Sequence, residues 1–275
     1  MQKRIALLRV VGLVLLLSIS TSINNDMPLT YGEKRSVRMI VTIDWEKEKP
    51  NIGGKDQYET VEETTAIILD MFEEHDIHAT FLVEYDSMAN MFQFEKLIER
   101  MIRDGHEIGL HFHGTDWYNC KEMKEWIRKA REEARRYDQK LVSFRAGCFI
   151  MTKDLKEALR ETGFLVDLSK APGYPGWDAN DTSYWDGEML ILPLTCSGRK
   201  YLNFYNKTMK RITVAEIESG TDTLVLYFHN WNIVNKDLTL NTKKIEYMYE
   251  YFTFLEKEYD VRYVTCGEYY DHLRS

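Results

Sequence analysis

The sequence predicts an α/β fold in which parallel strands alternate with helices. Short apolar, β-branched runs recur along the chain, and such runs are typical of strands buried on both faces. Segments with helical periodicity lie between several of these runs. Polar side chains end or follow the apolar runs of 38–46, 105–113, 141–145 and 224–229. Because parallel folds gather their functional groups at the carboxyl ends of strands, we expect these side chains to meet at one edge.

The first of these strands, 38–46, ends in two carboxylates. Asp44 and Glu46 flank Trp45 directly after the apolar run. Acids at the end of a buried strand fall where parallel α/β folds have their active sites. The alternative is that Asp44 caps the element that follows.

Three helices are predicted from hydrophobic periodicity. In 58–74 the core-facing side chains recur on one face, and the segments 88–103 and 121–136 precede the next strands. The Lys, Glu and Arg side chains of 121–136 are typical of a solvated helix face. These helices supply the alternation that an α/β fold requires.

The run at 105–113 has two histidines on one face. Side chains of a strand alternate with a period of two, so His111 and His113 project together while Leu110 and Phe112 pack behind them. Neutral imidazole is the commonest nitrogen ligand of zinc and its neighbours. We interpret the pair as half of a metal site. The alternative is two partly buried histidines that are hydrogen-bonded to the backbone.

Two later strands end in single polar residues. Arg145 ends the run at 141–145, and His229 ends the run at 224–229. Alternatively, Arg145 belongs to a surface ion pair, and His229 caps its strand by bonding a neighbouring carbonyl. Between 172 and 193 the alternation fails, and a long loop over the mouth of the fold is expected.

In order and spacing these residues resemble the polysaccharide deacetylases of the NodB-homology group, from about Ser36 to the C-terminus. The resemblance implies a distorted seven-stranded (β/α) barrel and a metal-dependent hydrolase. The segments that resemble the family's first, second, arginine and last motifs are 42–44, 105–111, 144–147 and 226–229. Two further runs, 80–83 and 163–169, resemble strands that the family has between its motifs.

Two motifs depart from the family pattern. Family members usually have adjacent aspartates in the first motif, and here Trp45 stands in the second place. The resemblance then implies Asp44 as base and Glu46 as metal ligand, with an exchange of the two roles as the alternative. Thr115 stands where the second motif usually has its second histidine, so His113 is expected to supply it. The alternative is that only His111 and water bind the ion.

The resemblance also implies a mechanism. A divalent ion, expected to be zinc with cobalt, nickel or manganese as alternatives, polarises the N-acetyl carbonyl and lowers the pKa of water. Asp44 takes the proton of that water, and His229 protonates the departing amine. Arg145 is expected to orient Asp44 through a bidentate contact. Asp167 is a candidate carboxylate partner for His229.

The implied substrate is an N-acetylated amino-sugar glycan of a cell envelope or another surface. Aromatic side chains stack on sugar faces, which makes Trp177, Trp185 and Trp231 candidate substrate-binding residues. The alternative for the aromatic side chains of the loop at 172–193 is a lid packed on the core. Two other functions stay open: a hydrolase of a small amide or imide on the same fold, and a non-catalytic glycan-binding relative.

Composition agrees with one enzyme domain and excludes a nucleic-acid partner. A chain of 275 residues is long enough for one (β/α) barrel, and we expect the catalytic domain to span 36–275. The net charge of −8 leaves no basic stripe to replace counterions on a nucleic acid. The four cysteines lie far apart without a Cys-x-x-Cys pair, so they are core residues or form one or two disulfides. The sequence does not predict the oligomeric state.

The N-terminal segment has the layout of an export signal. Lys3 and Arg4 precede an apolar stretch that ends at Ile19 and is followed by small polar residues. We expect 1–22 to be a cleaved signal peptide or a retained membrane anchor, and 23–35 to be a linker. Either form predicts an extracytoplasmic protein. The alternative is a true start further along the chain, which predicts a cytoplasmic one.

Overall fold

The computed structural model describes residues 33–47, 58–87, 89–197, 200–204 and 207–275. The predicted signal or anchor at 1–22 and most of the predicted linker at 23–35 lie outside the described residues. Residues Arg35–Ser275 form one compact unit. No helix in the described ranges has the length and apolar character needed to cross a membrane.

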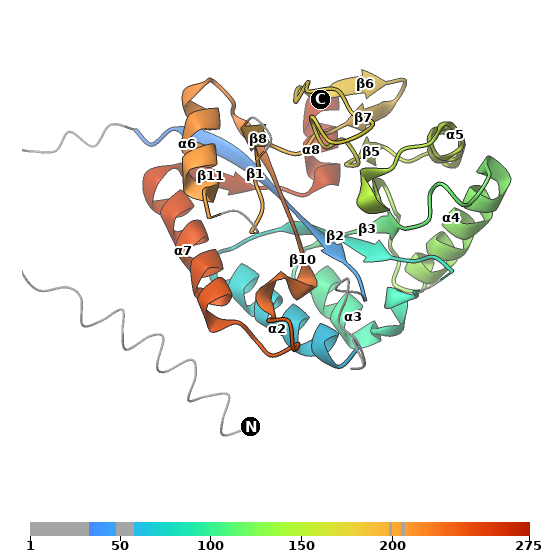
Figure 1. Ribbon diagram of the computed structural model, residues 1–275, viewed down its shortest axis with the longest axis horizontal. Coiled ribbons are helices and arrows are strands. Elements are labelled where there is room, and N and C mark those ends of the chain that lie inside the picture. The colour runs from blue at the N-terminus through green and yellow to red at the C-terminus, as the bar shows by residue number, and fades with distance from the viewer. Residues whose placement is uncertain (1–32, 48–57, 88, 198–199, 205–206) are drawn as a thin grey trace, which may run out of the picture. The chain divides into compact units, whose positions relative to one another are not determined.

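One curled sheet organises this unit (Figure 1). Seven strands are parallel neighbours in the order β10-β1-β2-β3-β4-β5-β7, with β6 antiparallel on the edge beyond β7 and β11 parallel to the start of β1. The predicted distorted seven-stranded (β/α) barrel is therefore confirmed. The strands of this sheet are β1 Ser36–Trp45, β2 Ala79–Glu84, β3 Glu107–Phe112, β4 Ser143–Ala146, β5 Val166–Asp167, β6 Tyr184–Asp186, β7 Met189–Ile191, β10 Thr223–His229 and β11 Asp260–Tyr263.

The barrel closes irregularly between β7 and β10. Here the backbone N–H of Thr195 donates to the Val225 carbonyl at 3.3 Å, and the Thr195 hydroxyl accepts from the Val225 N–H at 2.7 Å. A small two-stranded sheet of β8 Cys196–Ser197 and β9 Lys200–Tyr201 follows directly. A side-chain hydrogen bond thus replaces part of the regular hydrogen-bond ladder between strands. The barrel is distorted at this point.

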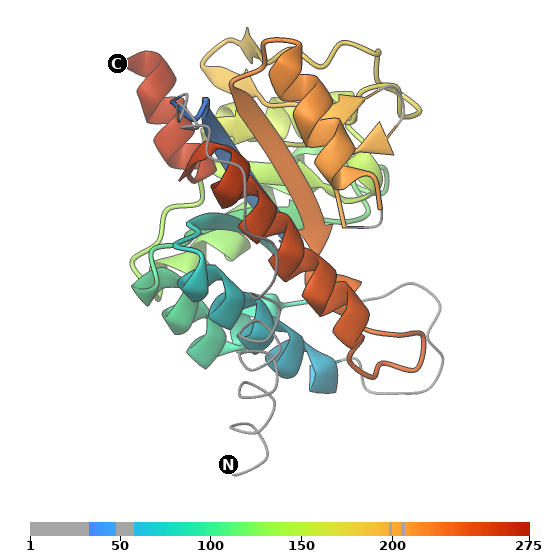
Figure 2. The same ribbon diagram turned by 90° about the vertical axis from the view of Figure 1, so that its left-hand side faces the viewer.

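Helices cover the outside of the sheet (Figures 1 and 2). The described α-helices are α2 Tyr58–Glu74, α3 Glu95–Arg103, α4 Cys120–Arg135, α5 Lys153–Thr162, α6 Met209–Glu218, α7 Thr242–Glu258 and α8 Cys266–Arg274. The short 3₁₀ helices are η1 Met91–Gln93, η2 Gly147–Phe149 and η3 Asn230–Ile233. The predicted helix 58–74 coincides with α2. The predicted helix 88–103 is divided into η1 and α3.

Side-chain alternation divides each central strand into an outer and an inner face. In β1 the outer side chains, among them Met39 and Val41, pack under the helices in the larger core cluster. The inner side chain Ile40 belongs to a second, smaller cluster inside the barrel. By the same period of two, Thr42 and Asp44 lie on the inner face toward the carboxyl end of β1. The fold thus directs the polar residues of β1 into the barrel mouth.

Helix α8 closes the amino end of the barrel. The Cys266 N–H donates to the Thr80 hydroxyl at 3.0 Å, and the Gly267 N–H donates to the Glu107 carboxylate at 2.7 Å. Tyr270 of α8 is buried in the inner cluster. The opposite, carboxyl end of the strands therefore stays available for a site.

The long loop expected between 172 and 193 is in part a hairpin. Strands β6 and β7 pair through Asp186 and Met189, with Gly187 at a φ of +67° in the two-residue turn between them. Glycine adopts this left-handed backbone without strain. The expectation of a loop was wrong here because the segment around Trp185 is too short to show a clear alternation. The four cysteines are all free thiols in the structure.

Candidate active site

Five neighbouring strands bring their polar inner-face residues to the carboxyl end of the barrel. In the register of the sheet Asp44 is level with His229 of β10, Glu84 of β2 is level with His111 of β3, and His111 is level with Arg145 of β4. These pairings follow from strands that are parallel and end together. The convergence predicted from the apolar runs is present in the structure.

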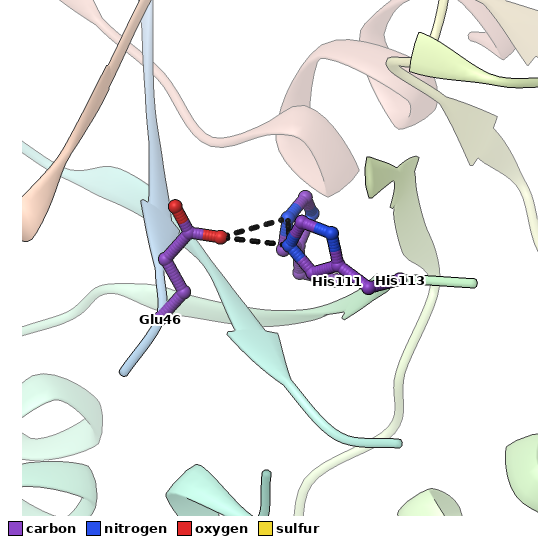
Figure 3. A group of neighbouring side chains, drawn as sticks. All are labelled: Glu46, His111 and His113. Atoms are coloured by element: carbon purple, nitrogen blue, oxygen red, sulfur yellow. Dashed lines mark hydrogen bonds and ion pairs between the residues drawn. The ribbon is translucent and has the colours of Figure 1, made fainter. Parts of the chain in front are cut away.

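Glu46, His111 and His113 form a compact cluster in this mouth (Figure 3). The Glu46 Oε2 atom lies 2.8 Å from Nε2 of His113 and 3.3 Å from Nε2 of His111. The two Nε2 atoms are 3.0 Å apart, and one ligand-capable atom of each residue lies within 4.8 Å of the others. One carboxylate and two imidazoles match the donors of catalytic zinc sites that keep a position for substrate. The residues therefore fit a divalent transition-metal ion.

Groups on the side away from Glu46 orient the two imidazoles. Nδ1 of His111 lies 3.1 Å from the carbonyl oxygen of Arg145, which can only accept, so Nδ1 carries the proton and Nε2 keeps its lone pair. The ring of His113 packs against Gly147, where an added Cβ would lie 2.3 Å from Nδ1. Both Nε2 atoms thus point at Glu46.

Charge coupling dominates the protonation of this cluster. Burial raises the pKa of Glu46, but His229, His111 and His113 outweigh it and hold the pKa well below the ordinary value. Burial lowers the pKa of His113, yet its hydrogen bonds with Cys148 and Glu46 raise that pKa to about 11. In the absence of an ion His113 is therefore the cation that pairs with Glu46. A metal ion would have to displace this proton, so its binding depends on pH.

Asp44 lies beside the cluster and is held by Arg145. Nη1 of the fully buried Arg145 donates to Asp44 Oδ1 at 2.6 Å, while Nη2 donates to the Thr42 hydroxyl at 2.8 Å. Nε of Arg145 donates to the Leu168 carbonyl at 3.1 Å. The predicted bidentate contact is wrong, because Thr42 shares the inner face with Asp44 and takes the second guanidinium nitrogen. Burial raises the pKa of Asp44, but Arg145 and the nearby imidazoles outweigh burial and lower it overall.

His229 lies between both carboxylates. Its Nε2 atom is 3.2 Å from Glu46 Oε1 and 3.8 Å from Asp44 Oδ2. Burial lowers the pKa of His229, although the two carboxylates act in the opposite direction. Asp167, the predicted carboxylate partner, instead accepts a hydrogen bond from the Ser169 N–H at 2.8 Å. That prediction was wrong because β5 ends at Asp167, and the side chain of Asp167 binds the backbone two residues further along the chain.

The structure adds site residues that sequence reasoning missed. Glu84 is buried at the end of β2, where its carboxylate accepts from the Lys47 N–H at 2.8 Å. Burial raises the pKa of Glu84 to about 7. An acid directly after the apolar run at 80–83 was the signal that could have revealed it. Asn230, whose side-chain oxygen accepts from the Glu46 N–H at 3.0 Å, had no comparable signal in the sequence.

The three predicted substrate tryptophans have different surroundings. Trp231 stacks on His229, with ring centres 4.2 Å apart and an interplanar angle of 24°. Trp177 donates to the Phe149 carbonyl at 2.9 Å, next to the mouth. Trp185, by contrast, packs on Tyr270 of α8 with ring centres 5.5 Å apart. Trp185 therefore lies with the closed amino end of the barrel, and we remove it from the candidate site.

Comparisons with known proteins agree with this fold. Residues 54–164 match the family model described as polysaccharide deacetylase. A Mycobacterium smegmatis protein assigned to the polysaccharide deacetylases superposes with a TM-score of 0.62 at 16% identity, over 92% of this chain and 95% of that one. The Puue allantoinase superposes with a TM-score of 0.61 at 17% identity, over 91% and 94% of the two chains.

A third solved structure is more distant in shape. The Bc1960 peptidoglycan N-acetylglucosamine deacetylase has a TM-score of 0.50 at 17% identity, over 86% of this chain and 89% of that one. The comparison with curated protein sequences finds no match. At these identities the likenesses show a common fold.

Proposed function

We propose that this chain, which belongs to the polysaccharide deacetylase family, removes N-acetyl groups from an amino-sugar glycan with the aid of one divalent metal ion. The observation that supports this proposal most is the cluster of Glu46, His111 and His113 beside an arginine-held Asp44. A ligand set and a separate, ionised carboxylate are the two parts that metal-assisted amide hydrolysis needs.

Glu46, His111 and His113 would hold the ion, which we propose to be zinc. Cobalt, nickel and manganese accept the same donors, so availability decides between them as much as affinity. When bound, the ion supplies Lewis acidity, which polarises an amide carbonyl and lowers the pKa of water. Asp44 is available as a base because Arg145 keeps it ionised.

We propose that one proton passes from Asp44 to His229 by way of a water molecule, because the two side chains are too far apart for a direct hydrogen bond. Asp44 would take a proton from the attacking water, and Nε2 of His229 lies 3.8 Å from Asp44 Oδ2. Burial keeps His229 neutral before the reaction, so it can accept this proton and donate it to the departing amine. His229 then acts as an acid without needing a charge at rest. Arg145 keeps Asp44 in one orientation throughout.

The proposed substrate is a glycan of a cell envelope or another surface. The family description and the deacetylase named for peptidoglycan N-acetylglucosamine support an N-acetylated amino sugar. Trp177 and Trp231, both near the mouth, are the proposed stacking residues. We further propose that 1–22 exports the chain or anchors it to a membrane, with 36–275 as the catalytic domain.

A small cyclic amide or imide is the second candidate substrate. The allantoinase that shares this fold over 91% of the chain favours it. The two substrates differ in size, and only an extended glycan would use a stacking side chain outside the metal cluster. A test of acetate release distinguishes the two.

The experiment measures acetate released from N-acetylglucosamine oligomers and from peptidoglycan by the zinc-loaded protein. Asp44→Asn is the matched control, since it removes the base and leaves the ligands. We expect release by the parent and loss in the variant. Hydrolysis of allantoin without acetate release would favour the second candidate. If the parent protein does not bind zinc and does not act on any of these substrates, the result would indicate a non-catalytic relative.

A further inference from the structure

We infer that Trp231 is a positioning residue for Glu46, with an indole N–H that fixes which carboxylate oxygen faces His111 and His113. This inference rests on the proposed function, because it gives Glu46 the part of a metal ligand. Nε1 of Trp231 donates to Glu46 Oε1 at 3.0 Å. The other oxygen, Oε2, faces His113 at 2.8 Å and His111 at 3.3 Å. Oε1 also lies 3.2 Å from Nε2 of His229, so the two oxygens of one carboxylate have separate sets of partners.

Glu46 needs such a contact because it lies beyond the end of its strand. β1 ends at Trp45, so the ladder hydrogen bonds of the sheet no longer fix the backbone of Glu46. A glutamate also has more rotatable bonds than an aspartate and loses more side-chain entropy when it is held still. A donor at a fixed place restricts this freedom before an ion arrives. Orientation of a ligand by an outer hydrogen bond is a general feature of metal sites.

One short helix supplies a contact to the backbone of Glu46 and another to its side chain. In η3, Asn230 accepts from the Glu46 backbone N–H at 3.0 Å and Trp231 donates to its carboxylate at 3.0 Å. These residues lie 184 and 185 positions along the chain from Glu46. The carboxylate and the backbone are therefore held from the same turn, which acts as a clamp on the segment after β1.

The indole of Trp231 is itself held in place. It stacks on His229 with ring centres 4.2 Å apart and an interplanar angle of 24°. The 3₁₀ turn is capped by Asn232, whose side-chain oxygen accepts from the His229 N–H at 2.6 Å. Because the stacked ring has a fixed plane, its N–H has a fixed direction. The donor is thus oriented by the fold and not by the carboxylate that it binds.

This positioning role differs from a role as a sugar-stacking platform. A platform needs the face of an aromatic ring, which phenylalanine also has. Positioning needs the indole N–H, which phenylalanine lacks. Trp231→Phe therefore separates the two roles: loss of zinc affinity indicates positioning, whereas a platform alone predicts zinc affinity and KM close to those of the parent.

The test measures the zinc affinity of the full chain by competition with a chromophoric chelator. We expect Trp231→Phe to bind zinc about 10- to 100-fold more weakly than the parent, the range typical for loss of an outer hydrogen bond to a ligand. Trp185→Phe, a tryptophan outside the site, is the matched control and should bind as the parent does. Circular dichroism of each variant checks that it is folded.

A second readout is the signal of the indole N–H in the metal-free protein. With ¹⁵N-labelled tryptophan, the resonance that disappears in Trp231→Phe should shift in Glu46→Ala, while the Trp185 resonance stays in place. Parent-like zinc affinity in Trp231→Phe would overturn the inference and leave the proposed function intact. A parent that binds no zinc would instead overturn the proposed metal site, and with it the part given to Trp231.

Discussion

Asp44 and Glu46, which are separated by Trp45, have different partners in the barrel mouth. Asp44 faces the guanidinium of Arg145 at 2.6 Å, and Glu46 faces the imidazoles of His111 and His113. A guanidinium does not give up its proton and does not bind a metal. It therefore keeps Asp44 ionised, so that Asp44 can act as a base. Imidazoles, by contrast, are themselves ligands. The different partners therefore favour Asp44 as base and Glu46 as ligand over the exchanged roles.

These roles predict different failures for two variants. Asp44→Asn should retain zinc and lose activity by about 10²- to 10⁴-fold, the usual contribution of a positioned base. Glu46→Ala should lose zinc affinity and, through it, activity. The zinc content and the rate of acetate release of each purified variant check this. An empty Asp44→Asn protein beside a zinc-filled Glu46→Ala protein would show that the roles are exchanged.

Gly147 is the second residue-scale feature with a testable consequence. An added Cβ would lie 2.3 Å from Nδ1 and 2.7 Å from Cγ of His113, inside van der Waals contact with a rigid ring. Gly147→Ala should therefore displace His113 and weaken zinc binding by at least about 10-fold, as other disturbances of a ligand's support do. The same substitution in a His113→Ala background should have little further effect. Equal losses in both backgrounds would contradict the steric explanation.

At the scale of the elements, strand period and parallel pairing explain which site residues the sequence could predict. His111, Arg145 and His229 all end apolar runs whose faces alternate, so their convergence followed once the strands were parallel. The clamp from η3 and the Arg145 bond to Thr42 could not be predicted. Both depend on the distance between segments more than 100 positions apart, which no local pattern contains.

The amino end of the barrel depends on Glu107, which joins α8 to the start of β3. Its half-buried carboxylate accepts from the Gly267 N–H at 2.7 Å and from the Thr80 hydroxyl at 3.3 Å. Glu107→Ala should lower the free energy of unfolding by about 3 kcal/mol, since it leaves buried donors without an acceptor. Glu107→Gln keeps an acceptor and should lose less. Urea unfolding followed by circular dichroism measures both, and equal losses would contradict the hydrogen-bond explanation.

At the scale of the whole molecule, the candidate site and the contacts that stabilise the fold lie at opposite ends of the barrel. The cluster of Glu46, His111 and His113 lies at the carboxyl ends of the strands, and α8 with Thr80 and Glu107 closes the amino ends. This division is the general one in (β/α) barrels. Six of the seven parallel strands could be predicted from apolar runs and their motifs, whereas β7 lies in the segment expected to be a loop. The irregular closure through Thr195 could not, because it uses a side-chain hydroxyl in place of a strand.

His106 makes the stability of the whole barrel depend on pH. It is buried at the amino end, where Nδ1 accepts from the Ala79 N–H at 3.2 Å and Phe72 and Phe81 pack against its ring. Burial lowers the pKa of His106 to about 4 from its ordinary value of 6.5. As the pH falls from 6.5 toward 4, the unfolded chain therefore binds a proton that the folded chain does not. The free energy of unfolding falls over this window.

The loss should reach about 3 kcal/mol at pH 4, since each pKa unit of difference corresponds to about 1.4 kcal/mol. His106→Asn is the control, because its amide oxygen can still accept from the Ala79 N–H but cannot titrate. Urea unfolding at several pH values between 7 and 4 should show a steeper decline for the parent than for the variant. Parallel declines would mean that other groups, and not His106, set the acid sensitivity of the fold.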